Sequence, residues 1–208
     1  MAIPSDRVRA EAPRAQRADA RRNVEAILDA AVACLARDPE VSVVDIAAAA
    51  GVGRVTLYGH FKTRAELIDA ALVRTIQRAD QILDATDMTG DPVEALSRLV
   101  ASSWEIVDQF RNILLAAHRE LPAERIRGVH DRILRRVQSL IERGQRSGAF
   151  RTDLPKRWLI TTAFSLMHAA AEDAAAGRVN VDRASGLIAA TLVAAFTPPG
   201  AEVRALPT

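Results

Sequence analysis

Apolar residues recur at helical spacing along most of the chain, and no segment shows the strict alternation of a half-buried strand. In the first periodic segment, apolar side chains return every three or four residues from Asn23 onward, and Asp38-Pro39 ends the run. The apolar positions of this segment are Val24, Ile27, Leu28, Ala31 and Leu35. The pattern predicts a first amphipathic helix that begins near Asn23.

Three more helices are marked by local start and stop signals. Ser42 stands three residues before Asp45, which is the spacing of a capping box, and Gly51-Val52-Gly53 breaks the alanine-rich helix that this box opens. Residues 54–60 form the next predicted helix. Residues 63–66, Thr-Arg-Ala-Glu, repeat the capping-box spacing and open a fourth helix.

Beyond residue 80 the helical period continues, with proline and glycine at its breaks. Leu121-Pro122 separates two long helices, and Gly177 follows a third as a C-cap. The helices predicted here run from 92 to this break, over 123–146, over 155–176 and over 182–196. The chain is therefore predicted to be all-α, with about nine helices and no apolar run long enough to span a membrane.

The last two predicted helices lack an ordinary polar face. From Trp158 to Ala176 and from Ala184 to Phe196 the side chains are apolar or small almost all round, as in helices that are covered on more than one side. Alanines and Gly186 permit close helix approach. We therefore expect a homodimer whose interface is a four-helix arrangement of these two helices and their symmetry mates.

Charge and composition narrow the class of protein. The net charge is only +2, from 28 Lys and Arg against 26 Asp and Glu, so overall charge says little about partners. Basic residues nevertheless gather in two clusters that suit phosphate contact. The clusters are Arg14, Arg17, Arg21 and Arg22, and Arg54, Lys62 and Arg64.

Other features of composition concern location and order. A single cysteine, Cys34, rules out an intramolecular disulfide. The absence of a signal-peptide pattern and of a membrane span predicts a cytoplasmic protein. Residues 1–20 are rich in Ala, Arg and Pro with few large apolar side chains, so we expect a mobile arm there.

Residues 43–61 have the layout of a helix-turn-helix: a helix that ends in four alanines, a turn with Gly51, and a helix rich in side chains that can contact DNA. Two stretches, DIAAAAGVG at 45–53 and TLYGHFKTRAEL at 56–67, resemble the signature of the TetR family of regulators. The resemblance runs from about Arg22 to Leu72.

This resemblance implies two domains with different functions. A three-helix DNA-binding domain over 21–68 would be joined to an α-helical ligand-binding and dimerisation domain over 69–200. The protein would bind a palindromic operator on double-stranded DNA as a dimer. A small hydrophobic effector would release it, and neither a cofactor nor a metal is expected.

Bases in the major groove are read by side chains at the N-terminal end of a recognition helix. Arg54 stands there, and a guanidinium can bridge O6 and N7 of guanine. Val55 and Thr56 follow and can contact a thymine methyl group. Gly59 departs from the family pattern, in which a larger side chain is common, so sequence discrimination should rest heavily on Arg54 and Thr56.

Phosphate contacts are expected around this helix. The family pattern implies that Tyr58, His60 and Lys62 contact the DNA backbone. Ser42 would offer its hydroxyl and backbone N–H to a phosphate. Arg21 and Arg22 would contact phosphate or the adjacent minor groove.

The family implies a ligand pocket among the C-terminal helices, but its lining cannot be transferred by motif. The candidates are the polar and aromatic residues on otherwise apolar helices, which could line an apolar cavity together. They are Trp104, Asp108, Phe110, Arg111, His118, Phe164, Met167 and His168. For each side chain alone, core packing is the alternative interpretation.

Three alternatives stay open at this level. An all-α enzyme is one, although His118 and Glu120 lie on different helix faces and no His-Glu-x-x-His motif occurs. A small-molecule-binding protein without sequence-specific DNA binding is another. Activation of transcription in place of repression is the third, because the sign of the regulatory effect depends on where the operator lies relative to the promoter.

Overall fold

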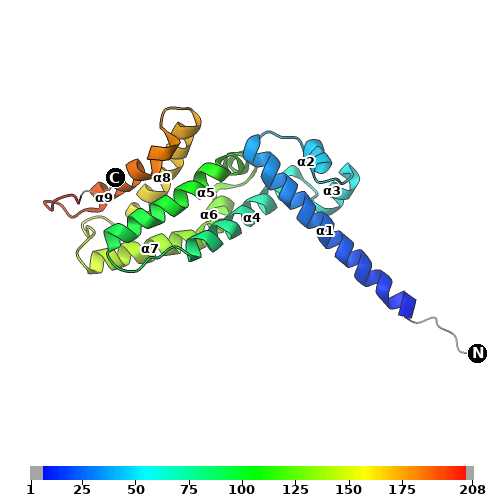
Figure 1. Cartoon of the computed structure of the whole chain (residues 1–208), viewed down its shortest axis with the longest axis horizontal. Helices are drawn as coiled ribbons and strands as arrows, with labels where there is room; N and C mark the ends of the chain where they lie inside the picture. The colour runs from blue at the N-terminus through cyan, green and yellow to red at the C-terminus, as the bar shows by residue number, and fades with distance from the viewer. Residues whose placement is uncertain (1–6, 205–208) are drawn as a thin grey trace, which may run out of the picture. The chain divides into compact units, whose positions relative to one another are not determined.

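The computed structural model describes residues 7–204, with side chains from residue 19 onward, and over that range it contains nine helices and no strand (Figure 1). The helices are α1 (Arg7–Arg37), α2 (Val43–Ala49), α3 (Arg54–His60), α4 (Arg64–Asp84), α5 (Pro92–Glu120), α6 (Ala123–Val129), α7 (Asp131–Arg146), α8 (Lys156–Ala175) and α9 (Val181–Phe196). The prediction of an all-α fold is confirmed. In the described part of the chain, no helix has the length and apolar character needed to cross a membrane.

Two compact units divide the described residues. The first comprises residues 7–74 and 112–121, and the second comprises residues 75–111 and 122–204. Helices α4 and α5 each supply residues to both units. The end of α5 therefore belongs with the N-terminal helices, whereas a division by position in the sequence places it with the rest of the C-terminal domain.

The first unit is built on the apolar face of α1. Ile27, Ala31 and Leu35 are spaced by four residues and are fully buried, so one side of the helix supplies a continuous apolar stripe. Helix α2 packs against α1 and α3 packs against α2. Their central contributions to this core are Ile46, which is fully buried, and Leu57, which is 1% exposed.

Local hydrogen bonds fix where α2 and α4 begin. The hydroxyl of Ser42 accepts from the backbone N–H of Asp45 at 3.1 Å. In the same way the hydroxyl of Thr63 accepts from the N–H of Glu66 at 3.0 Å. Both predicted capping boxes are thus confirmed as N-terminal caps.

Arg64, the first residue of α4, holds three segments of the first unit together. Its guanidinium donates to the carbonyl oxygen of Pro39 at 3.0 Å and to that of Val41. Its Nε also donates to the Glu120 carboxylate at the end of α5, at 3.2 Å. The loop between α1 and α2, the start of α4 and the end of α5 therefore share one cation.

The second unit packs the remaining helices around an apolar core. Helix α8 packs against both α7 and α9, and the rings of Phe150 and Phe196 meet edge to face at 5.6 Å. On α7, Arg136 pairs with Asp80 of α4 at 3.1 Å and also with Asp84. These ion pairs fix the C-terminal half of α4 against α7.

The prediction of one unbroken helix over 123–146 is wrong. The chain breaks at His130, which ends α6 and precedes α7. The backbone N–H of His130 bonds to the Arg127 carbonyl at 3.0 Å, a tighter turn than an α-helix makes. The break places the imidazole in the interior, where His130 is only 6% exposed, and Gly128 weakens the helix just before it.

The N-terminal segment differs from its expected form. Residues 7–20 belong to α1 in the structure, whereas the composition predicts a mobile arm over 1–20. Alanine and arginine are good helix formers, so their intrinsic propensity favours a helix here. Residues 1–6 of the expected arm lie outside the described residues, and the mobility of the arm stays a prediction.

Candidate nucleic-acid interface and ligand cavity

Helix α3 presents its N-terminal residues to solvent. Leu57 anchors the helix in the core, while Arg54, Val55 and Thr56 are all exposed. Val55 is 87% exposed, a position where a large apolar side chain gains nothing from folding. The exposed valine can contact methyl groups of a binding partner, while the arginine and the threonine beside it can form hydrogen bonds with polar groups of the same partner.

The guanidinium of Arg54 lies over the ring of Tyr58, with 5.4 Å between Cζ and the ring centroid. These residues are one helical turn apart, so both project from the same face of α3. A cation held over an aromatic face is partly ordered before any ligand arrives. Tyr58 is half-buried, which gives the arginine a fixed support.

Lys62 and His60 lie at the other end of α3. The ammonium of Lys62 is 3.2 Å from the carbonyl oxygen of Gly59 and 3.4 Å from that of Tyr58, so it neutralises the C-terminal end of the helix dipole. His60 is half-buried as the last residue of the helix. A phosphate contact by Lys62 would have to compete with these carbonyl contacts.

The residues before α3 that are predicted to contact DNA differ in their intramolecular partners. The Ser42 hydroxyl donates to the Asp45 carboxylate at 2.6 Å, so its proton is already used within the cap. Arg22 pairs with Asp19, and Arg21 is exposed. Sequence reasoning missed Val44, which is 51% exposed on the first turn of α2. Its apolar character predicts a buried position, but the buried valine of this turn is its neighbour Val43.

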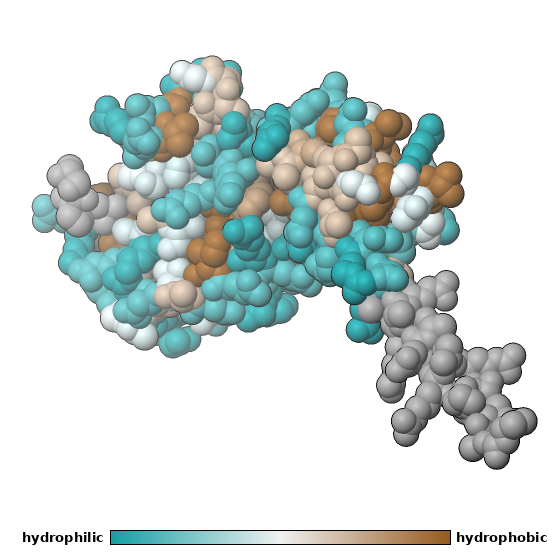
Figure 2. Space-filling model, turned by 45° about the vertical axis from the view of Figure 1, so that its right-hand side comes forward, coloured by the Kyte–Doolittle hydropathy of each residue, from teal (hydrophilic) through white to brown (hydrophobic). Residues whose placement is uncertain are grey.

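Hydrophobic side chains thus appear among hydrophilic ones on the surface formed by α2 and α3 (Figure 2). In the sequence, this mixed surface corresponds to a basic, an apolar and a hydroxyl side chain within one turn, Arg54, Val55 and Thr56. Because these side chains are contiguous in sequence, the motif could indicate them without knowledge of the tertiary fold.

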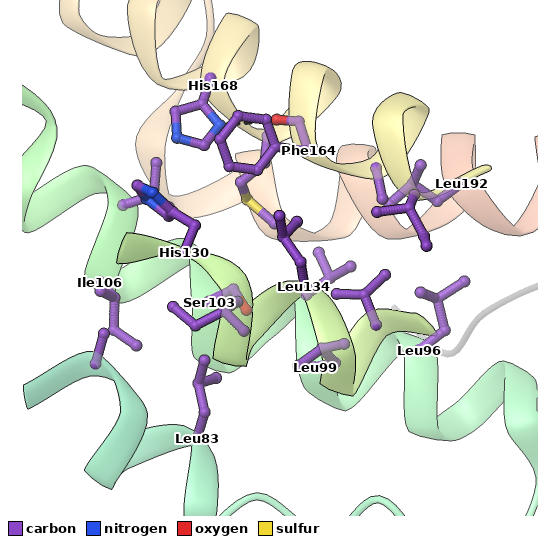
Figure 3. A pocket seen from close by; sticks show the side chains of 18 of the residues that line it. Leu83, Leu96, Leu99, Ser103, Ile106, His130, Leu134, Phe164, His168 and Leu192 are labelled. Atoms are coloured by element: carbon purple, nitrogen blue, oxygen red, sulfur yellow. Dashed lines mark hydrogen bonds between the residues drawn. The ribbon is translucent and has the colours of Figure 1, made fainter. Parts of the chain in front are cut away.

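The second unit contains an apolar cavity of about 110 Å³ between its helices (Figure 3). Five helices and the break between α6 and α7 contribute to its wall. The lining residues are Ile76, Ala79, Leu83, Leu96, Leu99, Val100, Ser103, Ile106, Val107, His130, Ile133, Leu134, Val137, Ile160, Ala163, Phe164, Met167, His168 and Leu192. No acidic or basic side chain other than the two histidines is among them.

One end of this cavity is formed by three rings, which Figure 3 shows side by side. The rings of His130 and Phe164 meet edge to face at 5.4 Å, and those of Phe164 and His168 lie 4.1 Å apart. Nδ1 of His130 is 2.7 Å from the carbonyl oxygen of Ile126. Nδ1 of His168 is likewise 2.8 Å from the carbonyl oxygen of Phe164.

These carbonyl contacts assign the tautomers of both histidines. A carbonyl oxygen can only accept a hydrogen bond, so Nδ1 of each ring carries a proton and donates it. The cavity therefore combines aliphatic walls with one end formed by two imidazoles and a phenyl ring.

The predicted ligand residues fall into two groups. Phe164, Met167 and His168 line the cavity. The other five do not: they are Trp104, Asp108, Phe110, Arg111 and His118. Whether any of the eight contacts a ligand stays a prediction.

The five outside the cavity have other surroundings. The indole N–H of Trp104 donates to the Val181 carbonyl at 3.1 Å, and Phe110 is 6% exposed in the core. Asp108 and Arg111 form an ion pair at 2.9 Å. Of these, His118 is exposed and belongs to the first unit.

Sequence reasoning missed His130 and Ser103 as lining residues. His130 was hidden within a segment predicted as one continuous helix, where a lone histidine carries no signal. Ser103 sits next to Trp104 on a long amphipathic helix and looks like an ordinary polar position. Only the packing of α5 against α7 and α8 brings such residues to one cavity.

Helices α8 and α9 expose small residues in stripes. On α8, Thr161, Ser165 and Ala169 are exposed at intervals of four. On α9, the exposed positions with the same spacing are Gly186, Ala190 and Ala194. Three large apolar side chains are exposed on the same helices: Trp158 at 58%, Leu187 at 51% and Val181 at 40%. Such stripes let another helix approach closely.

Comparison with known sequences gives two findings. A family model for bacterial regulatory proteins of the tetR family matches residues 27–71. The HTH-type transcriptional repressor LfrR of Mycolicibacterium smegmatis is 39% identical over 82 residues, which are 39% of this chain and 43% of that protein. The matched segment thus covers less than half of that repressor.

Comparison with solved structures extends the similarity to most of the fold. The TetR-like regulator LfrR from Mycobacterium smegmatis, in complex with proflavine, is 28% identical with a TM-score of 0.65 and covers 83% of this chain and 94% of its own. The regulator FadR from Bacillus subtilis, in complex with stearoyl-CoA, has a TM-score of 0.69 at 18% identity and covers 83% and 99%. The second similarity concerns the fold alone.

Proposed function

Because the chain belongs to the TetR family of bacterial regulatory proteins, we propose that it is a transcriptional repressor. It binds a palindromic operator as a homodimer and leaves the DNA when a small hydrophobic effector enters the cavity of the second unit. The observation that carries this proposal is the exposed start of α3, where Arg54, Val55 and Thr56 face solvent above the buried anchor Leu57.

In this proposal α3 enters the major groove with its N-terminal turn first. Arg54 bridges O6 and N7 of a guanine, and Val55 and Thr56 contact thymine methyl groups. The position of Arg54 over the Tyr58 ring reduces the freedom that the guanidinium loses on binding. Side chains around α3 hold the DNA backbone. They are Arg21, Arg22, Ser42, Tyr58, His60 and Lys62.

The homodimer is supported by the small-residue stripes on α8 and α9. A second copy of the chain would cover Trp158 and Leu187, whose exposure is costly in an isolated chain. A twofold dimer presents two copies of α3, which is why the operator is expected to be a palindrome.

Effector release requires that the ligand and DNA favour different arrangements of the protein. Helix α4 supports such coupling, because residues 64–74 belong to the first unit while Ile76, Ala79 and Leu83 line the cavity. A ligand that moves this wall would move the helix that leads to the DNA-binding unit. The structure of LfrR with proflavine supports a small organic effector for this chain as well.

The alternatives have less support. The cavity is lined mainly by apolar side chains and has no aspartate, glutamate, lysine or arginine to serve an enzyme. The similar proteins with stated roles are regulators. A binding protein without DNA recognition would have no use for an exposed Arg54-Val55-Thr56 turn. Repression is favoured over activation by the role of LfrR.

The test is selection of binding sites from random duplex DNA by the full-length protein at a fixed salt concentration. We expect a palindrome whose half-sites are about one helical turn, or a multiple of it, apart. Arg54→Ala should weaken binding by about 1–3 kcal/mol per half-site. Arg135→Ala is the matched control, because Arg135 is an exposed arginine on α7, in the other unit of the protein.

Enrichment of one sequence by the wild type and by Arg135→Ala, but not by Arg54→Ala, would support the proposal. If no sequence were enriched at any salt concentration, the chain would not be an operator-binding regulator. Equal enrichment by all three proteins would leave Arg54 without a role in base recognition.

A further inference from the structure

The second unit has another pocket, which shares no lining residue with the apolar cavity and has two arginines in its wall. Its volume is about 210 Å³, and its lining residues are Met88, Arg136, Ser139, Leu140 and Arg143. We propose that this pocket is a separate binding site for a monocarboxylate with a small apolar part, held through Arg143. The inference goes beyond the proposed function and does not depend on it.

One face of α7 supplies most of this pocket. Ser139 and Leu140 follow Arg136 by three and four residues, and Arg143 follows Leu140 by three, so these side chains are neighbours along the helix. Met88, from the segment between α4 and α5, completes the lining. The pocket thus combines two guanidinium groups, a hydroxyl and two apolar side chains.

The guanidinium of Arg143 lacks a partner. Its Nη2 atom is buried and has no hydrogen-bond partner in the part of the chain that the structure describes. Nor does Arg143 form an ion pair with any of the described side chains. A buried donor without an acceptor has lost its hydration and gained no hydrogen bond in return. A ligand with a negatively charged acceptor would replace that lost interaction.

The other arginine of the pocket is already neutralised. Arg136 pairs with Asp80 at 3.1 Å and also with Asp84. Arg143 is therefore the cation of this lining whose charge is free for a ligand. A single free cation favours a ligand with a single negative charge.

Asp87 also limits the charge that a ligand can carry here. Its carboxylate accepts from the hydroxyl of Thr89 at 2.6 Å and from the backbone N–H of Thr89 at 2.8 Å. These hydrogen bonds lower the pKa of Asp87, and the positive charges of Arg98 and Arg143 add to the effect. Asp87 is thus a negative charge within the electrostatic reach of Arg143, and it would repel a second charge on the ligand. A carboxylate suits the pocket better than a phosphate dianion.

The donors of the pocket also match a carboxylate in shape. A guanidinium presents a planar fork of N–H groups that can bond to both oxygens of one carboxylate. Ser139 is exposed one helical turn before Arg143, and its hydroxyl can donate to the same group. Both donors therefore serve one head group.

The apolar part of the lining sets the size of the rest of the ligand. Met88 is half-buried, and Leu140 is 3% exposed. A cavity of about 150 Å³ holds benzene, so a pocket of about 210 Å³ accommodates one ring together with its carboxylate. Benzoate is a molecule of this class.

The test compares four ring compounds as ligands of the full-length protein without DNA, by isothermal titration calorimetry at pH 8 and constant ionic strength. They are benzoate, phenyl phosphate, benzyl alcohol and benzylammonium. At this pH phenyl phosphate is a dianion, because the second pKa of a phosphate monoester is about 6. We expect benzoate to bind more tightly than phenyl phosphate, and at least about tenfold more tightly than the other two.

Variants of α7 then localise the binding. Arg143→Gln removes the charge and should weaken benzoate binding by about tenfold or more. Arg143→Lys keeps the charge without the fork, so its loss should be smaller. Arg135→Gln is the matched control, because Arg135 is an exposed arginine of the same helix outside the pocket, and it should bind benzoate as the wild type does.

A further variant separates the two binding sites of the unit. Ala163 lines the apolar cavity and not this pocket. Ala163→Leu narrows that cavity, so it should leave benzoate binding unchanged if the ligand lies against Arg143. An unfolding curve of each variant shows that it is folded.

Benzoate binding that Arg143→Gln weakens, and that Arg135→Gln and Ala163→Leu preserve, would support the site even if the protein bound no operator. No binding of benzoate to the wild type, or equal binding to Arg143→Gln, would overturn it. So would loss of benzoate binding in Ala163→Leu alone, since the ligand would then occupy the apolar cavity. Tighter binding of phenyl phosphate or benzyl alcohol than of benzoate would contradict the assignment to a monocarboxylate.

Discussion

The start of α3 and the cavity of the second unit are built in opposite ways. The start of α3 is a single turn of contiguous residues that face solvent, held in place by one buried leucine. The cavity gathers side chains from five helices, and nearly all of them are apolar. The exposed residues at the start of α3 can change without loss of stability, because exposed residues contribute little to folding.

The cavity residues, in contrast, have two roles. Leu96 and Leu99 line the cavity and are at most 4% exposed, so they belong to the core of the unit as well. A change in ligand preference therefore also changes packing. This difference explains why a local motif can indicate the exposed first turn of α3 but not the lining of the cavity.

The largest effect is expected from removing the anchor of α3. Leu57→Ala deletes a side chain that is 1% exposed and should lower the free energy of unfolding by about 2–5 kcal/mol. Operator binding should be lost with it, because α3 is no longer fixed. Chemical denaturation and a DNA-binding titration measure the two effects.

The matched control is Leu115→Ala on α5, since Leu115 belongs to the same unit but is 42% exposed. It should change stability by less than about half of the smallest value expected for Leu57→Ala. An equal loss in both variants would mean that α3 is not held by Leu57.

A smaller effect is expected from Val55→Ala, and on DNA binding alone. Since Val55 is 87% exposed, its truncation should leave unfolding unchanged. Loss of methyl contacts with DNA should weaken operator binding by about 1 kcal/mol per half-site. Unchanged operator affinity would show that Val55 does not touch the bases.

In the second unit, the cap of α5 should contribute about 1 kcal/mol. The Asp91 carboxylate accepts from the N–H groups of Val93 and Glu94 at 2.9 and 3.1 Å. Burial raises the pKa of Asp91, but these backbone bonds and Arg204 outweigh burial and lower its pKa below the ordinary 3.8. Asp91→Ala removes the cap.

The sign of the pH dependence follows from this lowered pKa. The contribution of the charged carboxylate is fully present above pH 3.8 and is lost as the pH falls through the lower folded pKa. The difference between wild type and Asp91→Ala, measured by denaturation, should therefore be constant near neutral pH and shrink in acid. With Asp91→Asn, which keeps an acceptor, the loss at neutral pH should be smaller; a difference that grows in acid would contradict this account.

The smallest effect is expected from Gly59→Ala, and it should be stabilising. Gly59 lies within α3, and a Cβ there would meet no atom within 4 Å. Alanine should raise the free energy of unfolding by up to about 1 kcal/mol, because it is the better helix former. A decrease would show a constraint at this position that the free protein does not reveal.

Features of the fold that depend on a few neighbouring residues could be predicted from the sequence, whereas features that depend on tertiary packing could not. The caps at Ser42 and Thr63 and the end of α8 before Gly177, which has a φ of 70°, are written within a few residues, so they could be predicted. The break at His130 could not, because it depends on the burial of the imidazole among α6, α7 and α8. The same holds for the cavity, where His130 meets Phe164 through tertiary packing.

The partners of individual side chains also depend on tertiary structure. The phosphate contacts of Lys62 and Ser42 stay predictions, and the structure adds partners that would compete with a phosphate, the C-terminal carbonyls of α3 and the Asp45 carboxylate. Such partners depend on side-chain geometry that spacing alone does not specify. The aromatic character of Trp104 and Phe110 predicts a place in the cavity wall, but both are buried elsewhere in the core and do not line the cavity.

The central claim is that the first turn of α3 reads DNA sequence. The most direct measurement is the ratio of affinities for the selected palindrome and a scrambled duplex of equal length, by fluorescence anisotropy at one salt concentration. The account predicts a ratio of about a thousand or more for the wild type, and for Arg54→Ala a much smaller ratio with similar affinity for the scrambled duplex. Equal affinity of the wild type for both duplexes would contradict it.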